Sequence, residues 1–188
     1  FSADDYFVGT TSVAYWAADS SNSDSIQFGS DPFTVAVWVK SLSGDLFPSG
    51  GSDDLLGKRA TTNDGPGWKI EFQSDFDIRL RLENDAGSAA GIDLRMAGEP
   101  ASGAVWLVWF TRNANHTWHV EVHGAGDTRE TTSSALNWDL KDNSVFRLGF
   151  CNSSYWDNKI GDVVIWPETK TEEFMLEYYN AYLSEHSN

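Results

Sequence analysis

Two aromatic residues stand in a polar loop near the end of the chain, a combination that suits sugar binding. The loop spans Cys151–Lys159 and is rich in Asn, Ser and Asp. Aromatic faces stack on the C–H surfaces of sugars, while amides and carboxylates bond the hydroxyls. The predicted ligand-binding set is Asn152, Tyr155, Trp156, Asp157 and Asn158. The alternative is that Trp156 folds back onto the edge of a sheet.

Three further residues have the types that bind transition metals. His119, Glu121 and His123 alternate along "TWHVEVHG" and therefore share one face of a strand. Two imidazoles and a carboxylate are a ligand set for Zn or Fe. Such residues on a strand are more often simply its solvent face, and we favour that interpretation, since a metal site needs a closed geometry and a second shell.

Two predicted strands flank the aromatic loop. Val145–Phe150 is a short apolar run before it, and Ile160–Trp166 after it is rich in β-branched and aromatic residues. Pro167 ends the second run, because proline has no N–H for a sheet ladder. This segment therefore reads as strand, loop and strand.

A closing helix follows the second strand. Thr169–Glu172 matches the capping-box pattern that opens a helix. Phe174, Tyr178 and Ala181 recur beyond it at helical spacing. The sequence predicts one short C-terminal helix.

Upstream, strict alternation predicts strands with one buried face. In "GWKIEFQ" the inward residues are Trp68, Ile70 and Phe72, and "DIRLRLEN" directs Arg79 and Arg81 outward. "FTVAVWVK" is apolar on one face and half apolar on the other, which indicates protein on both sides. "AVWLVWFTR" is typical of a central strand, and "HTWHVEVHG" completes a hairpin with it. Gly44–Asp54 reads as a loop. Strands recur roughly every 8 to 12 residues, the rhythm of an antiparallel sandwich.

Composition restricts the partners. Lys and Arg number 13 and Asp and Glu 28, so the net charge is −15. This charge argues against nucleic acid or an anionic membrane surface, which need basic patches. No apolar run approaches the roughly 18 to 20 residues that span a bilayer.

Cys151 is the only cysteine, so no intrachain disulfide forms. We expect one domain over residues 1–188, in a processed chain or an excised piece, since the sequence begins at Phe1 without Met.

Several segments together resemble a known family. "FTVAVWVK", "LLGKR", "GWKIEF", "DIRLRL", "AVWLVWFTRNANHTWHVEVHG", "VFRLGF" and "KIGDVVIWPETKTEEFMLEYYN" follow the order seen in laminin-G-like domains of the concanavalin A-like lectin/glucanase superfamily. The last segment is also similar to pentraxins. The resemblance covers roughly Asp4 to Tyr182. It implies an all-β fold, an antiparallel jelly roll of two sheets, with the helix at its end.

The resemblance also implies one structural Ca²⁺ at the sandwich edge. Asp4 and Asp5 match the acidic pair of the family's first strand, and Asp162 matches the acidic position of its "GDV" segment. Asn22 and Asp24 stand in a neighbouring loop and could add oxygen ligands. The alternative is that these are ordinary solvated acids. The loop around Asp157 is shorter than the pentraxin calcium loop, so a double-calcium site is not expected.

The catalytic branches of this superfamily carry motifs that the chain lacks. Glucanases place two Glu on one strand as E-x-D-x-x-E, because acid and nucleophile must stand about 5 to 5.5 Å apart. Glu71 in "IEFQSD" and Glu121 in "VEVHG" have no such partners. The Arg, Gln, His and Tyr set of the polysaccharide lyases is matched only weakly, by "RLRLEN" and "WHVEVH". We therefore predict a chain that is not an enzyme, with glycosidase or lyase activity as the third alternative.

The leading prediction is a recognition domain that binds a glycan through edge loops, in an extracellular protein or on a particle surface. The runner-up is a structural protein that decorates a bacteriophage capsid or tail and docks on its lattice. We expect no nucleic-acid partner and no membrane insertion.

Overall fold

Twelve short extended segments and one helix form the described part of the protein. The computed structural model describes residues 7–8, 16–17, 28–42, 46–59, 66–84, 86–98, 101–124, 127–132, 135–140, 144–149, 156 and 158–186. The strands are β1 (Phe7–Val8), β2 (Trp16–Ala17), β3 (Phe33–Lys40), β4 (Ser52–Arg59), β5 (Gly67–Gln73), β6 (Asp77–Glu83), β7 (Ala89–Arg95), β8 (Val105–Arg112), β9 (Trp118–Gly124), β10 (Asp127–Thr132), β11 (Phe146–Leu148) and β12 (Lys159–Trp166). The helix α2 spans Glu172–His186.

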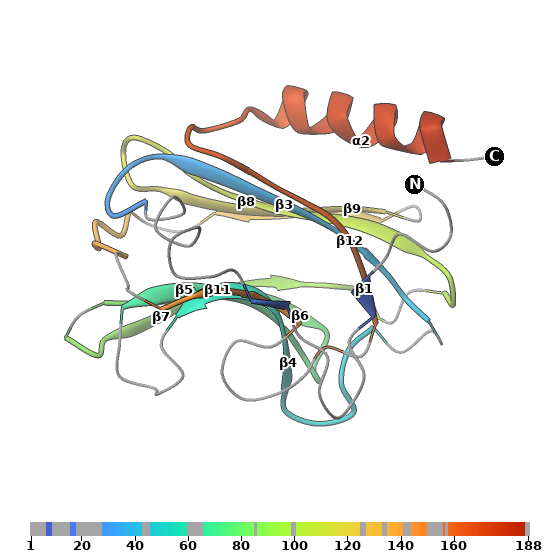
Figure 1. The fold of residues 1–188 in the computed structure, drawn as a ribbon, viewed down its shortest axis with the longest axis horizontal. Helices are drawn as coiled ribbons and strands as arrows, with labels where there is room; N and C mark the ends of the chain where they lie inside the picture. Colours follow the sequence, from blue (N-terminus) through green and yellow to red (C-terminus); the bar gives the residue numbers. More distant parts are fainter. Residues whose placement is uncertain are drawn as a thin grey trace.

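The strands form two six-stranded sheets that face one another (Figure 1). One sheet has the order β1-β12-β3-β8-β9-β10, and we call it the helix-side sheet because α2 covers it. The other has the order β2-β11-β4-β5-β6-β7, and we call it the charged sheet. Each pairing among the described strands is antiparallel. The predicted two-sheet antiparallel sandwich with a C-terminal helix is thus confirmed.

The core lies between the sheets and follows the predicted alternation. Trp68, Ile70 and Phe72 of β5 all lie in it, each at most 1% exposed. On β3, Val35 and Val37 point into this core, while Ala36 and Trp38 point the other way, toward α2. The prediction that β3 meets protein on both faces is confirmed. Because inward and outward residues alternate, the core pattern also determines which side chains reach the outer faces.

The N-terminal half of β4 differs from the sequence prediction. β4 begins at Ser52, inside the stretch interpreted as a loop up to Asp54. The pairing with β5 changes register between Asp54 and Leu56, and this irregularity interrupts the simple alternation. A Gly/Ser/Asp-rich stretch therefore forms a strand because its partner strand pairs with it, against its local preference.

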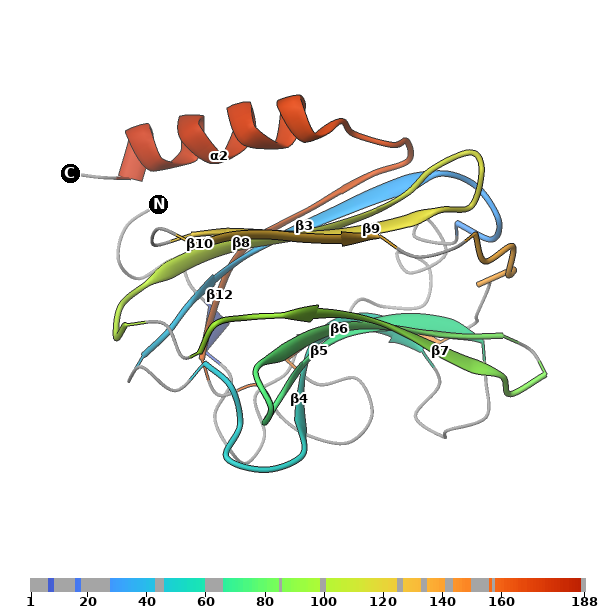
Figure 2. The same cartoon turned by 180° about the vertical axis from the view of Figure 1, so that it is seen from behind.

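The helix α2 lies across the outer face of the helix-side sheet (Figures 1 and 2). Its N-cap is Thr171, whose Oγ1 accepts a hydrogen bond from Phe174 N at 3.2 Å. The predicted cap position, Thr169, instead donates its hydroxyl to Arg112 O.

Of the helically spaced residues Phe174, Tyr178 and Ala181, the first two pack against the sheet. Ala181 is exposed, whereas Met175 and Tyr182 are buried against the sheet, with Phe174 and Tyr178 partly buried beside them. In the described part of the chain, no helix is both long and apolar enough to cross a membrane.

Candidate functional site

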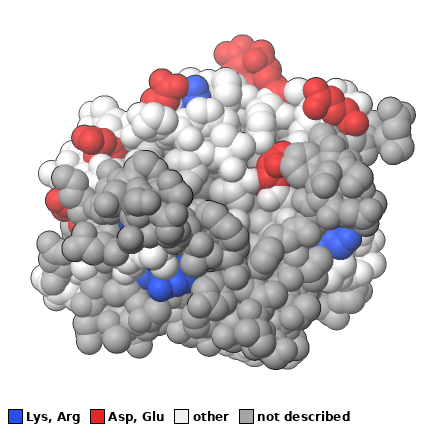
Figure 3. All heavy atoms as spheres, viewed as in Figure 1, with Lys and Arg blue, Asp and Glu red and all other residues white. Residues whose placement is uncertain are grey.

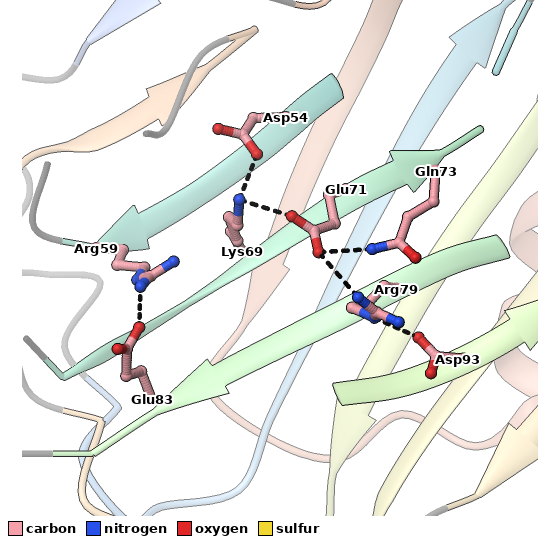
Figure 4. Close-up of polar contacts among 8 residues, drawn as sticks. All are labelled: Asp54, Arg59, Lys69, Glu71, Gln73, Arg79, Glu83 and Asp93. Carbon is pink, nitrogen blue, oxygen red and sulfur yellow. Dashed lines mark hydrogen bonds and ion pairs between the residues drawn. The ribbon is translucent and has the colours of Figure 1, made fainter. Parts of the chain in front are cut away.

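The outward side chains of the charged sheet form a row of alternating charges, which we call the charge ladder. It crosses the sheet from β4 to β7 and consists of Asp54, Lys69, Glu71, Arg79 and Asp93 (Figure 4). Lys69 Nζ lies 2.6 Å from both Asp54 Oδ1 and Glu71 Oε2. These three residues are at most 2% exposed although they point away from the core. Burial makes each charge costly unless it is paired, and here each has an opposite charge within contact distance.

Arg79 continues the ladder toward the edge of the sheet. Its neighbours across the strands are Glu71 on β5 and Asp93 on β7, so it stands between two carboxylates. Arg79 Nε donates to Asp93 Oδ1 at 2.5 Å, and Nη1 lies 3.8 Å from Glu71 Oε1. The hydrogen bond to Asp93 raises the pKa of the Arg79 guanidinium, against the opposing effect of its partial burial. Arg79 is therefore held in place by residues of the protein itself.

Arg81 lies two residues further along β6 and has very different neighbours. Across the strands it pairs with Lys69 on β5 and with Gly91 on β7. One neighbour is a cation that is already engaged, and the other has no side chain. Arg81 is partly buried, and its Nε is inaccessible and lacks a hydrogen-bond partner within the described residues. Arg81 makes no ion pair within the described residues and is only partly buried, so its guanidinium suits an oxygen ligand from outside the chain.

A hollow of about 270 Å³ opens on this face at the β7 edge, and we call it the β6–β7 hollow. Its lining residues are Arg79, Arg81, Ala89, Ala90, Gly91 and Asp93. The hollow exists because β7 contributes small residues, and Gly91 in particular leaves room for Arg79. A Cβ at Gly91 would lie 3.1 Å from Arg79 Nε. The hollow is slightly smaller than typical ligand pockets, which measure about 300–1,000 Å³.

A separate ion pair lies at the other end of the same face of the charged sheet. Arg59 and Glu83 contact one another and are 1% and 2% exposed (Figure 4). They connect β4 to β6 across Gly67, which has no side chain in between. This pair is buried and does not line the hollow, so we assign it a structural role.

The predicted aromatic loop takes a different form around Trp156. Its indole is fully buried and packs on Phe72, with ring centroids 4.8 Å apart. A ring in the core has no face to offer a sugar, so the predicted stacking role of Trp156 does not fit, and the alternative of packing on the sandwich does. Asn158 is 2% exposed, and its Oδ1 accepts a hydrogen bond from Leu42 N.

The rest of that loop and most of the predicted calcium ligands lie outside the described residues. These are Asn152, Tyr155 and Asp157 of the loop, and Asp4, Asp5, Asn22 and Asp24 of the predicted calcium site. Asp162 is described: it is partly buried where β12 changes register against β3. Within the described ranges, no group of three or more His, Cys, Asp or Glu could hold a metal ion. The calcium assignment stays a prediction.

The three metal-type residues of β9 lie on the outer face of the helix-side sheet. Glu121 is 1% exposed and contacts both imidazoles, with His119 Nε2 3.0 Å from its Oε2 and His123 Nε2 against its Oε1. The His123 ring stacks on Trp109. The interpretation of this strand face as solvent-exposed is wrong for Glu121 and His123. Burial and these contacts give the three residues a packing role.

Sequence reasoning placed Arg79 and Arg81 outward but did not recognise a site. The signal that could have found it is Gly91 in "AAGID", a strand residue without a side chain beside an outward arginine. Using that signal requires knowing that β7 pairs with β6 in this register.

No protein-family model and no curated protein matches this chain. Solved structures do. A carbohydrate-binding module, the CBM40 of the Ruminococcus gnavus IT-sialidase bound to α2,6-sialyllactose, has a TM-score of 0.65 at 12% identity over 92% of this chain and 96% of that one. A leech intramolecular trans-sialidase complexed with 2,7-anhydro-Neu5Ac has a TM-score of 0.67 at 14% identity, over 92% of this chain and 27% of that one.

Toxin domains share the fold as well. The receptor-binding domain of botulinum neurotoxin type G has a TM-score of 0.60 at 13% identity over 81% of this chain. The chain spans 38% of the length of that domain. At these identities the likeness shows the fold alone: a β-sandwich of the kind found in carbohydrate-binding modules and toxin binding domains. The laminin-G and concanavalin A resemblance stays a prediction.

Proposed function

We propose that this protein is a non-catalytic carbohydrate-recognition domain that binds an acidic sugar in the β6–β7 hollow. The fold it shares over nearly its whole length with a sialidase CBM40, solved with a sialyllactose, supports a glycan as the ligand. The proposal moves the site from the predicted loop to the sheet face. Its setting, in this proposal, is the surface of a cell-external protein or of a particle.

The observation that carries the proposal is the Arg81 guanidinium, which lines the hollow and makes no ion pair within the described residues. A guanidinium presents a planar fork of donors that matches a carboxylate in a bidentate arrangement. The small residues Ala89 and Gly91 let a ring approach the strand closely. Asp93 at the rim can accept a hydrogen bond from a sugar hydroxyl. An acidic monosaccharide offers both groups on one ring.

The same geometry favours binding over hydrolysis. A glycosidase needs two carboxylates free to act as acid and as base or nucleophile. Asp93 lines the hollow and Glu71 stands behind it, and both contact Arg79, so neither carboxylate is free to act in this way.

The test is titration calorimetry with 3′- and 6′-sialyllactose, with lactose as the neutral control, in calcium and again in EDTA. We expect Arg81→Met to weaken binding of the acidic sugar at least tenfold, since a hydrogen bond to a charged group contributes about 1.5–3 kcal/mol. The matched control is Arg95→Met. Arg95 is on the neighbouring strand β7, is 61% exposed and lies outside the hollow lining, so the control removes the same charge from the same sheet.

Two results would overturn the proposal. One is a folded wild-type protein that binds no acidic sugar. The other is equal loss of affinity in the Arg81 and Arg95 variants, which would attribute binding to overall charge. If EDTA leaves both affinity and melting temperature unchanged, the predicted Ca²⁺ plays no part in this site.

A further inference from the structure

We propose that Asp93 restricts the β6–β7 hollow to sugars that carry one negative charge, by acting as a built-in competitor for Arg79. The inference rests on the proposed function, because it concerns which acidic glycans the same site accepts. It makes Asp93 a specificity-determining residue, although its side chain has the same sign of charge as the ligand.

The two arginines of the hollow lie two residues apart on β6 and both point outward, but they have different partners. Arg79 already has Asp93 at 2.5 Å and Glu71 at 3.8 Å. Arg81 faces Lys69 and Gly91 across the strands, neither of which can neutralise it. The hollow therefore offers one guanidinium to a ligand and keeps the other occupied.

The charges around the hollow balance before any ligand enters. Arg79 and Arg81 contribute two positive charges, and Asp93 and Glu71 two negative ones. Lys69 adds no attraction, because it lies between Asp54 and Glu71 in the buried part of the ladder. A ligand with one carboxylate can pair with Arg81. A second anionic group on the ligand would find no free cation among the residues that line the hollow.

Asp93 is placed to repel that second group. It is 43% exposed, the most accessible member of the charge ladder, and it lines the hollow beside Arg79. A sulfate or second carboxylate reaching toward Arg79 would meet the Asp93 carboxylate first. Like charges in close contact disfavour binding, so polyanionic glycans should be rejected.

The experiment compares two probes on four proteins. The probes are 3′-sialyllactose, with one charge, and a sulfated heparin tetrasaccharide. The proteins are the wild type, Asp93→Asn, Asp93→Glu and the control Asp75→Asn. Asp75 is 57% exposed, pairs with Arg95 at 3.6 Å and does not line the hollow. The control therefore removes one negative charge from the same region without freeing Arg79.

We expect Asp93→Asn to raise the affinity for the tetrasaccharide relative to sialyllactose at least tenfold. Asp93→Glu should keep the wild-type ratio, and Asp75→Asn should change it less than threefold. A ratio in Asp93→Asn no higher than in Asp75→Asn overturns the inference, while sialyllactose binding that still depends on Arg81 leaves the proposed function standing. Absence of all glycan binding by the wild type overturns both. Melting curves of each variant establish that it is folded.

Discussion

Each outer face of the sandwich has a fully buried part, and opposite chemistry buries it on the two sides. On the helix-side sheet, Trp38 is completely buried and stacks on Tyr182 of α2 with centroids 3.8 Å apart. On the charged sheet, Asp54 is equally buried, but its partner is the Lys69 ammonium. Both faces arise from the outward half of an alternating strand pattern. The alternation of the strand decides whether a side chain points inward or outward. The groups that cover the side chain decide the free energy of burying it.

The energetic consequences differ. Apolar contact under α2 is favourable on burial and tolerates small adjustments. The residues of the charge ladder lose hydration free energy on burial, and only ion pairs of good geometry offset that loss. The ladder therefore contributes little to the free energy of unfolding, but it fixes the positions of its side chains. The face shown in Figure 3 has no comparable order of charges among the described residues. In the view of Figure 3, the described carboxylates are scattered along the side where α2 lies and form no single patch.

The largest effect that separates the two faces should come from Trp38→Ala. Removing a fully buried indole from beneath α2 should lower the free energy of unfolding by about 3–5 kcal/mol, since a large cavity remains. Urea denaturation followed by circular dichroism measures this. Leu176→Ala is the control, because Leu176 is 43% exposed on α2 and should change stability by less than about 0.5 kcal/mol. Equal effects of the two variants would mean that α2 does not depend on this contact.

A second effect, of about 3 kcal/mol, should come from Lys69→Met on the charged face. The substitution leaves Asp54 and Glu71 buried without their shared cation. The distinguishing feature is rescue: adding Asp54→Asn and Glu71→Gln should restore at least half of the lost stability, because the uncompensated charges disappear with them. Denaturation of the single and triple variants tests this. Failure of the rescue would show that Lys69 acts through packing of its stem.

A smaller effect should appear at alkaline pH on the helix side. Burial raises the pKa of Tyr178 and Tyr179 above the ordinary value of 10.0, and for Tyr178 the Asp162 charge adds to the rise while its contact with Trp38 opposes it. The neutral phenols are therefore favoured in the folded state. Their contribution to stability is complete below pH 10 and is lost as the pH rises from there through the folded-state pKa.

Ultraviolet titration of the tyrosines, run beside melting curves from pH 8 to about pH 12, measures this effect. The variant Tyr178→Phe should flatten the alkaline fall in melting temperature. The same fall in the variant and in the wild type would contradict a role for this residue.

The smallest effect on stability should come from Gly91→Ala in the hollow. The new methyl group would press on Arg79 Nε and Cδ, at 3.1 and 3.2 Å, and a flexible side chain can move by the few tenths of an ångström required. We expect a stability change within about 0.5 kcal/mol. The hollow narrows, however, so affinity for sialyllactose should fall about threefold, or roughly 0.7 kcal/mol. Unchanged affinity would place the ligand elsewhere.

Much of the fold followed from local patterns. Alternation in β5 and β6 correctly predicted the core residues and the outward direction of Arg79 and Arg81, because side chains on a strand alternate regardless of what covers them. The N-cap is Thr171 and not the predicted Thr169, whose hydroxyl is engaged by a tertiary contact with Arg112 O.

The site was less predictable for the same reason. Trp156 stands in a polar sequence, and nothing local distinguishes a binding aromatic from one that reaches back to Phe72. The difference depends on a contact between residues 84 positions apart in the chain.

The sequence by itself determined most of the strands, their inward faces, the closing helix and the net negative charge, because each follows from residue types at short spacing. Only the tertiary structure decided that Arg79 meets two carboxylates while Arg81 meets Lys69 and Gly91. Strand register is a non-local property, set by how whole strands pair and pack. Two arginines in the same local sequence therefore acquire different roles only after the sheet has formed.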